Sequence, residues 1–192
     1  MRDAKSAPKD VAQKPRALRI DADIRTVVFD LDGTLYDKRG LACRMVFCLW
    51  WSLPLLIIDR RAKGALWRWI VGTRWHKHVF LPTMVWLIEH HYTARTEALD
   101  LLMRCRKREL QTAVYSDYGA IEQKLSALRI DPMQFDLLIS APELGDRKPS
   151  KASAEEVLRR LNATPETTLF IGDRHEKDGE AARAVGAKYL NI

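Results

Sequence analysis

Cysteine is scarce in this chain of 192 residues. The three cysteines, Cys43, Cys48 and Cys105, form no pattern with metal-ligand spacing. An odd and sparse set of thiols argues against a disulfide framework and is typical of a protein from a reducing compartment. Four histidines lie within residues 76–91, and their spacings fit no closed zinc site with the cysteines. We therefore expect neither a disulfide-rich fold nor a structural zinc centre.

The chain also lacks an uncharged run long enough to span a bilayer, which requires about 20 residues. The stretch Met45–Ile58 has 14 residues, among them one serine and one proline. The first residues contain no apolar segment of the kind found in signal peptides, and Asp3 and Asp10 interrupt the basic pattern of a transit peptide. We expect residues 1–22 to be a disordered basic leader of a cytoplasmic protein, with association with the inner face of the membrane left open.

The net charge of +7 is unevenly distributed. Residues 37–95 carry ten Lys or Arg and three Asp or Glu, an excess of seven, whereas the rest of the chain is close to neutral. Such a block attracts anionic lipid, nucleic acid or a polyanionic substrate. A solvated basic face is the alternative interpretation. All six tryptophans of the chain fall in the same segment.

Outside that segment, strand and helix patterns alternate. We expect strands at Ile24–Phe29, Thr112–Tyr115, Phe135–Ile139, Thr168–Ile171 and Lys188–Asn191, and helices at 95–109, Gly119–Leu128, Ser153–Leu161 and Glu176–Val185. The helix at 95–109 is expected to bury Leu99, Leu102 and Met103, with Cys105 as a further candidate. This alternation predicts βαβ units and therefore a doubly wound α/β fold around a parallel sheet.

The first expected strand leads into Asp30-Leu31-Asp32-Gly33-Thr34. In an open α/β sheet, ligands bind at the carboxyl ends of the strands. A structural role does not call for two carboxylates here, because each would require a partner or exposure to water. The pattern indicates a site for a cation and a phosphate.

Three later segments repeat this arrangement. Ser116 and Asp117 follow the second expected strand, Lys148 lies in a loop before a helix, and Asp173 follows a later strand with Asp178 five residues on. Taken in order, the four segments resemble the haloacid dehalogenase superfamily, in its phosphatase branch. The resemblance covers roughly residues 24–37 and 96–192. It implies a Rossmann-like catalytic core made of residues 23–37 and 96–192.

The resemblance also implies a role for each matching residue. Asp30 would be the nucleophile that forms an aspartyl-phosphate, and Asp32 the general acid and then the general base. Lys148 would neutralise the charge that develops in the transition state. Mg²⁺ would be held by Asp173, the Asp30 carboxylate and the Asp32 backbone carbonyl, with Asp178 supporting Lys148 or the metal's water molecules. The phosphate-binding residues would be Gly33, Thr34, Ser116 and Asp117.

Asp32 narrows the reaction, since within the superfamily a second aspartate in the first motif is typical of phosphatases and phosphomutases. We predict a phosphomonoester hydrolase, with a phosphomutase as an alternative. A catalytically silent, membrane-associated interaction module on the same fold is the third possibility. Asp117 stands where many relatives carry asparagine, which changes the expected contacts to the leaving group.

Residues 38–95 occupy the position of a C1-type cap, which in this superfamily is commonly helical and selects the substrate. One interpretation is a compact helical cap whose tryptophans form its own core. The other is a cap that contacts the membrane surface, because short apolar segments are flanked here by arginine, lysine and tryptophan. The substrate would be a phosphorylated small molecule or a lipid phosphate. Nucleic acid is a poor candidate, and the sequence leaves the oligomeric state open.

Overall fold

The computed structural model describes residues 20–192 of the chain. Residues 1–19 of the expected leader, which was predicted to span residues 1–22, lie outside the described residues. The Arg108 guanidinium donates hydrogen bonds to the backbone carbonyls of Ile20 and Asp21, both at 2.9 Å. Ile20 and Asp21 therefore lie beside the C-terminal end of the helix that Arg108 follows.

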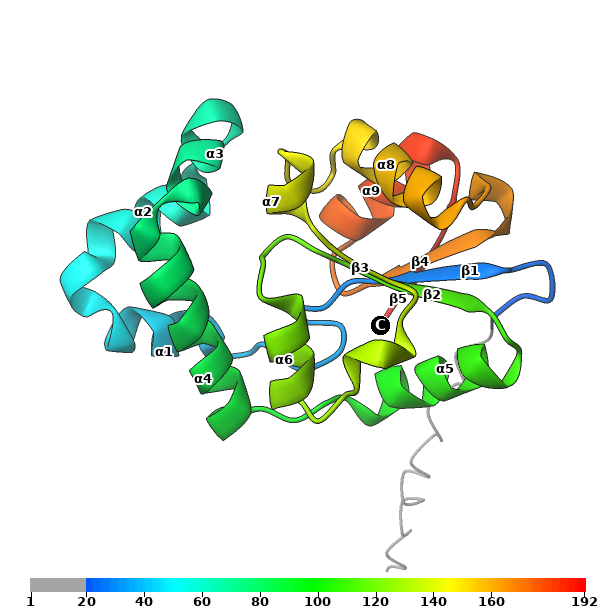
Figure 1. Ribbon diagram of the computed structural model, residues 1–192, viewed down its shortest axis with the longest axis horizontal. Coiled ribbons are helices and arrows are strands. Elements are labelled where there is room, and N and C mark those ends of the chain that lie inside the picture. The colour runs from blue at the N-terminus through cyan, green and yellow to red at the C-terminus, as the bar shows by residue number, and fades with distance from the viewer. Residues whose placement is uncertain (1–19) are drawn as a thin grey trace, which may run out of the picture.

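A parallel sheet of five strands forms the centre of the described fold (Figure 1). The strands are β1 (Thr26–Phe29), β2 (Gln111–Ser116), β3 (Leu137–Ser140), β4 (Thr168–Gly172) and β5 (Lys188–Asn191), in the order β3-β2-β1-β4-β5. Strand β1 lies in the middle, where Phe29 pairs with Val114 of β2 and with Ile171 of β4. This register brings the carboxyl ends of β1, β2 and β4 to one edge of the sheet.

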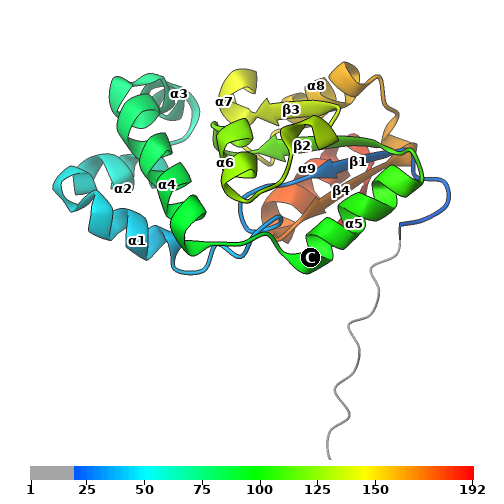
Figure 2. The same cartoon turned by 60° about the horizontal axis from the view of Figure 1, so that its bottom comes forward.

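Helices cover both faces of the sheet, as the turned view also shows (Figure 2). The helices after β1 and its insert are α5 (Thr96–Lys107), α6 (Ile121–Ala127), α7 (Ala141–Leu144), α8 (Lys151–Leu161) and α9 (Glu180–Val185). Val27 and Phe29 join a core cluster with residues of α5 and α6, whereas Val28 joins a second cluster with residues of α8 and α9. Alternating side chains of β1 therefore enter opposite layers, which confirms the expected doubly wound fold.

All five predicted strands are present, within two residues of the expected bounds. The apolar face predicted for the helix at 95–109 is wrong in one respect. Helix α5 buries Ala98, Leu101, Leu102 and Cys105, and Leu99 packs half-buried against the same core, whereas Met103 is 54% exposed. The buried set follows the i, i+3, i+4, i+7 spacing of one helical face, and Met103 lies off that face.

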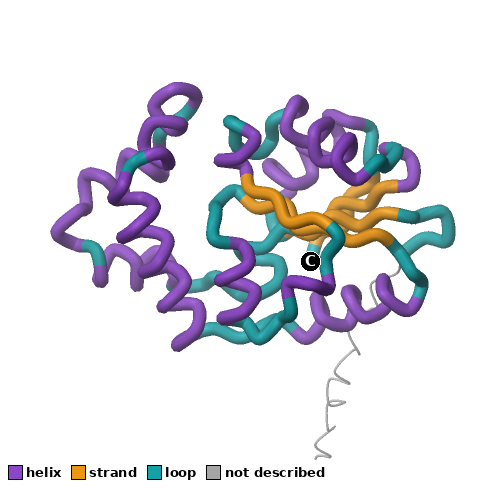
Figure 3. The backbone as a smooth tube through the Cα atoms, in the orientation of Figure 1, coloured by secondary structure: helices purple, strands orange, loops and turns teal. Residues whose placement is uncertain are grey.

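Residues 38–95 fold into helices at one end of the sheet (Figures 1 and 3). They are α1 (Leu41–Cys48), α2 (Leu53–Arg61), α3 (Gly64–Gly72) and α4 (Leu81–His91), the last preceded by a π-helical turn at His76–Phe80. We call this segment the helical insert. Its buried side chains share the two core clusters of the sheet, with Met45 and Met84 in one and Trp67 and Ile70 in the other.

The expectation that the tryptophans form a separate core of the insert is wrong. Trp67 is fully buried and Trp75 is half-buried, but Trp50, Trp51, Trp69 and Trp86 are each between 49% and 73% exposed. Among the described helices, none is long and apolar enough to cross a membrane by itself. Helix α1 and the following segment Trp50–Arg61 meet the length and composition criteria only as a pair, bent by 88°.

Candidate active site

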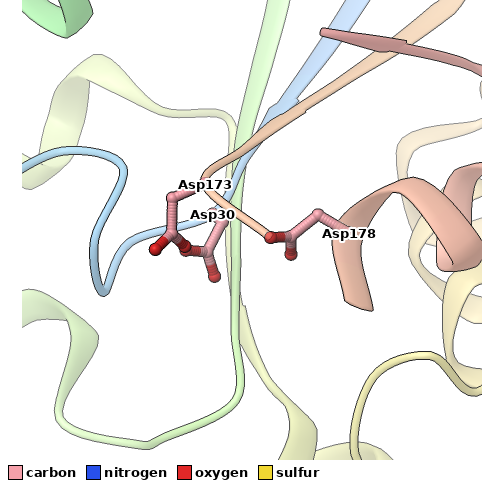
Figure 4. A group of neighbouring side chains, drawn as sticks. All are labelled: Asp30, Asp173 and Asp178. Atoms are coloured by element: carbon pink, nitrogen blue, oxygen red, sulfur yellow. The ribbon is translucent and has the colours of Figure 1, made fainter. Parts of the chain in front are cut away.

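Three carboxylates converge at the edge of the sheet where β1 and β4 end (Figure 4). Asp30 follows β1, Asp173 follows β4, and Asp178 lies in the π-helical turn His175–Gly179 that leads into α9. One oxygen of each carboxylate lies within 4.8 Å of the others. The structure thus brings together three of the residues predicted from sequence motifs more than 140 positions apart.

Lys148 lies in the loop between α7 and α8 and is buried against this cluster. Its ammonium group donates hydrogen bonds to Asp30 Oδ1 at 2.5 Å, Asp178 Oδ1 at 2.6 Å and the Tyr115 carbonyl at 3.0 Å. Burial raises the pKa of Asp30 to about 7, and the Lys148 ammonium opposes that shift. The carboxylates in turn keep the pKa of Lys148 above its ordinary value, against the effect of burial. Lys148 therefore carries a fixed positive charge beside Asp30.

Asp32 has a different set of partners from Asp30. The Lys124 ammonium contacts Asp32 Oδ2 at 2.8 Å, the Tyr36 hydroxyl donates to Asp32 Oδ1 at 2.7 Å, and the Ser116 hydroxyl donates to Asp32 Oδ2 at 3.0 Å. Burial by itself would raise the pKa of Asp32, but Lys124 and the hydroxyl donors hold that pKa below its ordinary range. In this arrangement Asp32 is an ionised carboxylate, which is the form of a general base. To act as a general acid it must first separate from Lys124.

Sequence reasoning missed Lys124 and Tyr36. Lys124 is fully buried on α6, where Ile121, Lys124, Leu125 and Leu128 occupy one helical face. A lysine within an apolar stripe is a sign of a buried charge that needs a partner, and this signal was available in the sequence. The sequence did not show that the partner of Lys124 is Asp32, which lies 92 residues earlier in the chain.

Gly33 and Thr34, which were predicted to bind phosphate, lie directly beside carboxylates of the site in this structure. Thr34 donates a hydrogen bond from Oγ1 to Asp30 Oδ2 at 3.1 Å. Gly33 has φ +108°, and a Cβ there would overlap the Asp173 carboxylate. A Cβ at Gly172 would likewise overlap the carboxylate of Asp178. The glycines therefore allow the carboxylates to approach the backbone closely, and a direct contact of Gly33 or Thr34 with phosphate stays a prediction.

Asp117 contacts the lysines of the site. Its Oδ1 accepts a hydrogen bond from the Lys148 backbone N–H at 3.0 Å, and its Oδ2 forms an ion pair with Lys177. Asp117 thus fixes the loop that carries Lys148. The neighbouring Arg147 extends toward the helical insert, where it donates to the Asp59 carbonyl at 3.0 Å and lies over the ring of Trp67.

The oxygen atoms of this edge are suited to a hard divalent cation. Mg²⁺ takes carboxylate and carbonyl oxygens together with water. The Lys38 ammonium contacts two of the oxygens predicted to bind the metal, the Asp32 carbonyl at 2.6 Å and Asp173 Oδ2 at 2.8 Å. The position therefore binds a positive charge that the chain itself supplies. Lys38 was not predicted, and its side chain is 35% exposed and so has room to move.

Comparison with known proteins identifies one family. A family model described as haloacid dehalogenase-like hydrolase matches residues 24–186. The chain is 33% identical over 93 residues to glyceraldehyde 3-phosphate phosphatase of Methanocaldococcus jannaschii, an alignment that covers 47% of this chain and 40% of the relative. The chain thus spans less than half of that relative. It is also 25% identical over 180 residues to phosphoglycolate phosphatase of Aquifex aeolicus, covering 86% of this chain and 83% of the relative.

Solved structures agree on the fold. CbbY from Rhodobacter sphaeroides in complex with phosphate superposes with a TM-score of 0.65 at 20% identity, over 86% of this chain and 84% of the other. A predicted phosphoglycolate phosphatase from Haemophilus somnus superposes with a TM-score of 0.66 at 19% identity, over 88% and 85% of the two chains.

The Lys124–Asp32 pair provides a test of the buried charges. We expect Lys124→Met to lower the free energy of unfolding by about 3–5 kcal/mol, because a buried carboxylate loses its cation. Asp32→Asn should be similarly costly, since it leaves Lys124 buried without a counter-charge. The loss of unfolding free energy in the double variant should be clearly smaller than the sum of the losses in the two single variants. Urea denaturation at neutral pH measures all three, and strictly additive costs would contradict the pairing.

Proposed function

This chain belongs to the haloacid dehalogenase-like hydrolase family, and on that premise we propose that it is a Mg²⁺-dependent phosphomonoester hydrolase that acts through an aspartyl-phosphate. The observation that carries the proposal is the buried contact of Lys148 with both Asp30 and Asp178 at the edge of the sheet. A carboxylate beside a fixed ammonium group is suited to attack a phosphoryl group, because the ammonium attracts the anionic substrate and neutralises the charge that develops. Relatives named as phosphatases support the same reaction class.

The reaction needs two steps from the residues of this chain. An oxygen of Asp30 attacks phosphorus and the bond from phosphorus to the leaving oxygen breaks. Asp32, which has separated from Lys124 and is protonated at this stage, gives that oxygen a proton. Asp32 then takes a proton from a water molecule whose oxygen attacks the aspartyl-phosphate. The bond between Asp30 and phosphorus breaks and inorganic phosphate is released. Lys148 stays protonated throughout and holds the phosphoryl oxygens.

Mg²⁺ would be held by Asp30, Asp173 and the Asp32 carbonyl, and when bound it offsets negative charge on the phosphoryl oxygens. Asp178 pairs with Lys148 and so fixes the position of the ammonium group. The carboxylates of Asp30, Asp173 and Asp178 lie in one cluster, in which Lys148 contacts Asp30 and Asp178 and Lys38 contacts Asp173. When Lys38 moves away, the negative charge of the cluster exceeds the positive charge of Lys148. A dication would balance this excess.

We further propose that residues 38–95 act as a cap that contacts an anionic membrane, where the enzyme meets an amphiphilic phosphate. Among the described residues, nine of the eleven large apolar side chains with high exposure lie in this insert. Phe47 near the end of α1, together with Trp50 and Trp51 between α1 and α2, forms what we call the aromatic bend. These three side chains are 83%, 73% and 58% exposed. The exposed side chains of Arg60, Arg61, Lys63 and Arg68 follow on α2 and α3. Aromatic rings next to basic side chains are typical of a surface that binds the interface of anionic lipid.

The nucleophile can be tested directly. We expect Asp30→Asn to lower the rate of phosphate release from phosphate esters at least about 10⁴-fold, because the amide cannot form the covalent intermediate. Removal of Mg²⁺ with a chelator should abolish turnover reversibly. Acid-quenched wild type should carry one phosphoryl group by mass spectrometry, whereas Asp30→Asn should carry none.

Asp37→Asn is the matched control for this test, because Asp37 lies in the same loop and is 46% exposed. It should keep nearly full activity. Transfer of the phosphoryl group to an added sugar instead of water would favour the phosphomutase. A failure to turn over any ester, lipid phosphates included, would favour the catalytically silent module.

Lys38 offers a test of the metal position that needs no turnover. We expect Lys38→Met to bind Mg²⁺ up to about 30-fold more tightly than wild type, measured by calorimetry without substrate. The reason is that an ammonium group and a dication about 4 Å apart repel by ~2 kcal/mol even at the dielectric constant of water. Lys177→Met, which removes a lysine that pairs with Asp117, should change the affinity much less. Equal affinities for wild type and Lys38→Met would contradict the assignment of the metal position.

Membrane contact can be measured by flotation with vesicles of phosphatidylglycerol and phosphatidylcholine. Replacing the three residues of the aromatic bend by serine should reduce partitioning at least about tenfold, which corresponds to the loss of only ~55 Å² of buried apolar area. The control replaces Met103 and Met133, which are 54% and 86% exposed outside the insert, and should float like wild type. Wild type that stays unbound at every fraction of anionic lipid would refute the contact.

A further inference from the structure

The predicted catalytic residues line a cavity of about 610 Å³ whose two sides differ in chemistry. On the side of the sheet the lining is charged and includes Asp30, Asp32, Lys148 and Asp173. On the side of the helical insert the lining consists of nine apolar residues and three charged ones, Lys38, Asp59 and Arg60. A volume of this size accommodates a ligand as large as a typical cofactor or drug.

The apolar side is built from three helices of the insert, together with Phe80 of the π-helical turn. Helix α1 contributes Leu41 and Met45, α2 contributes Leu53 and Ile57, and α4 contributes Met84. The charged residue Asp59 is buried and paired with Arg147, so its carboxylate already has a counter-charge. Hydroxyl groups of a sugar placed against such a wall would lose their hydrogen bonds to water without replacement. The wall therefore favours a hydrocarbon leaving group.

The apolar wall continues to the outside of the molecule. Met45 and Met84 are buried, whereas Val46, Leu53 and Ile57 line the cavity and are also 43%, 41% and 46% exposed. Leu53 is the second residue after Trp51 of the aromatic bend. An apolar path thus runs from the carboxylate cluster to the surface that carries the most exposed aromatic side chains.

We propose that this wall, which we call the chain site, binds the single hydrocarbon chain of an alkyl or isoprenoid monophosphate whose phosphate lies at Asp30. The chain would enter from the lipid surface between α1 and α2. This inference rests on the proposed function, because it assigns the leaving group of the same reaction. It goes further by separating single-chain phosphates from phosphorylated sugars and hydroxy acids.

The test measures binding of a series of n-alkylphosphonates, from methyl to octyl, by calorimetry with Mg²⁺ and without vesicles. Phosphonates have no ester bond to hydrolyse, so binding is read without turnover. Affinity should rise about fourfold for each added methylene until the chain fills the cavity. Fourfold is the gain in affinity for full burial of one methylene group. All concentrations are kept below those at which the probes form micelles.

A matched pair of variants locates the chain. Ala42 and Cys43 are adjacent exposed residues of α1, but only Ala42 lines the cavity. Ala42→Phe should place a ring in the chain site and weaken octylphosphonate binding at least about tenfold while methylphosphonate binding is kept, which shows that the variant is folded. Cys43→Phe adds a similar side chain outside the cavity and should bind the whole series like wild type.

The chain site would be overturned by equal affinity of wild type for methylphosphonate and octylphosphonate, or by an unchanged chain-length dependence in Ala42→Phe. Failure of octylphosphonate to bind at all would have the same consequence. Failure of the proposed function is seen separately, as an absence of ester hydrolysis in a protein that still binds longer phosphonates more tightly.

Discussion

Two buried lysines make this edge of the sheet possible. Asp30, Asp32 and Asp178 are each at most 9% exposed and lie near one another, which would be strongly unfavourable without cations. Lys148 pairs with Asp30 and Asp178, and Lys124 pairs with Asp32. Each carboxylate thus has an ammonium group as a direct partner. Asp30 and Asp32 have different partners, and this difference would separate the proposed nucleophile from the proposed acid and base.

These ion pairs fix positions more than they stabilise the fold. Removing a charge from water costs about as much as a buried pair returns, so a buried salt bridge is weak evidence for stability. The two apolar clusters on either side of β1 hold the layers together. Lys124 on α6 and Lys148 in the loop before α8 then tie elements from opposite faces of the sheet to the carboxyl end of β1. The result is a frame in which the carboxylate oxygens of Asp30 and Asp32 have fixed neighbours.

The helical insert belongs to this frame and at the same time presents an apolar exterior. Trp67 and Ile70 share a cluster with the sheet, and Arg147, the residue before Lys148, contacts both Asp59 and Trp67. A movement of the insert would therefore displace the loop that carries Lys148. Its outer helices expose aromatic and aliphatic side chains that a monomer in water gains nothing by exposing. The proposed membrane contact and the proposed chain site would both account for that exposure.

The sequence by itself determined the α/β architecture and most of the site. Strand and helix periods are local, and parallel strands bring Asp30, Ser116 and Asp173 to one edge whatever the details of packing. The spacing of Gly33 and Thr34 after Asp30 fixes the loop in the same local way. These residues could be named because each follows a recognisable strand.

Tertiary structure alone decided the partners and the exposed surfaces. Lys124 meets Asp32 across 92 residues, and Lys38 meets Asp173 across 135, distances over which no local pattern carries information. Trp67 is buried and Trp69 is 58% exposed on one helix, because only one of its faces meets the core. The same applies to Met103, which belongs to an apolar stretch but lies off the packed face of α5. Composition fixed how much apolar surface the insert has, and packing of the insert against the sheet decided which part of it remains outside.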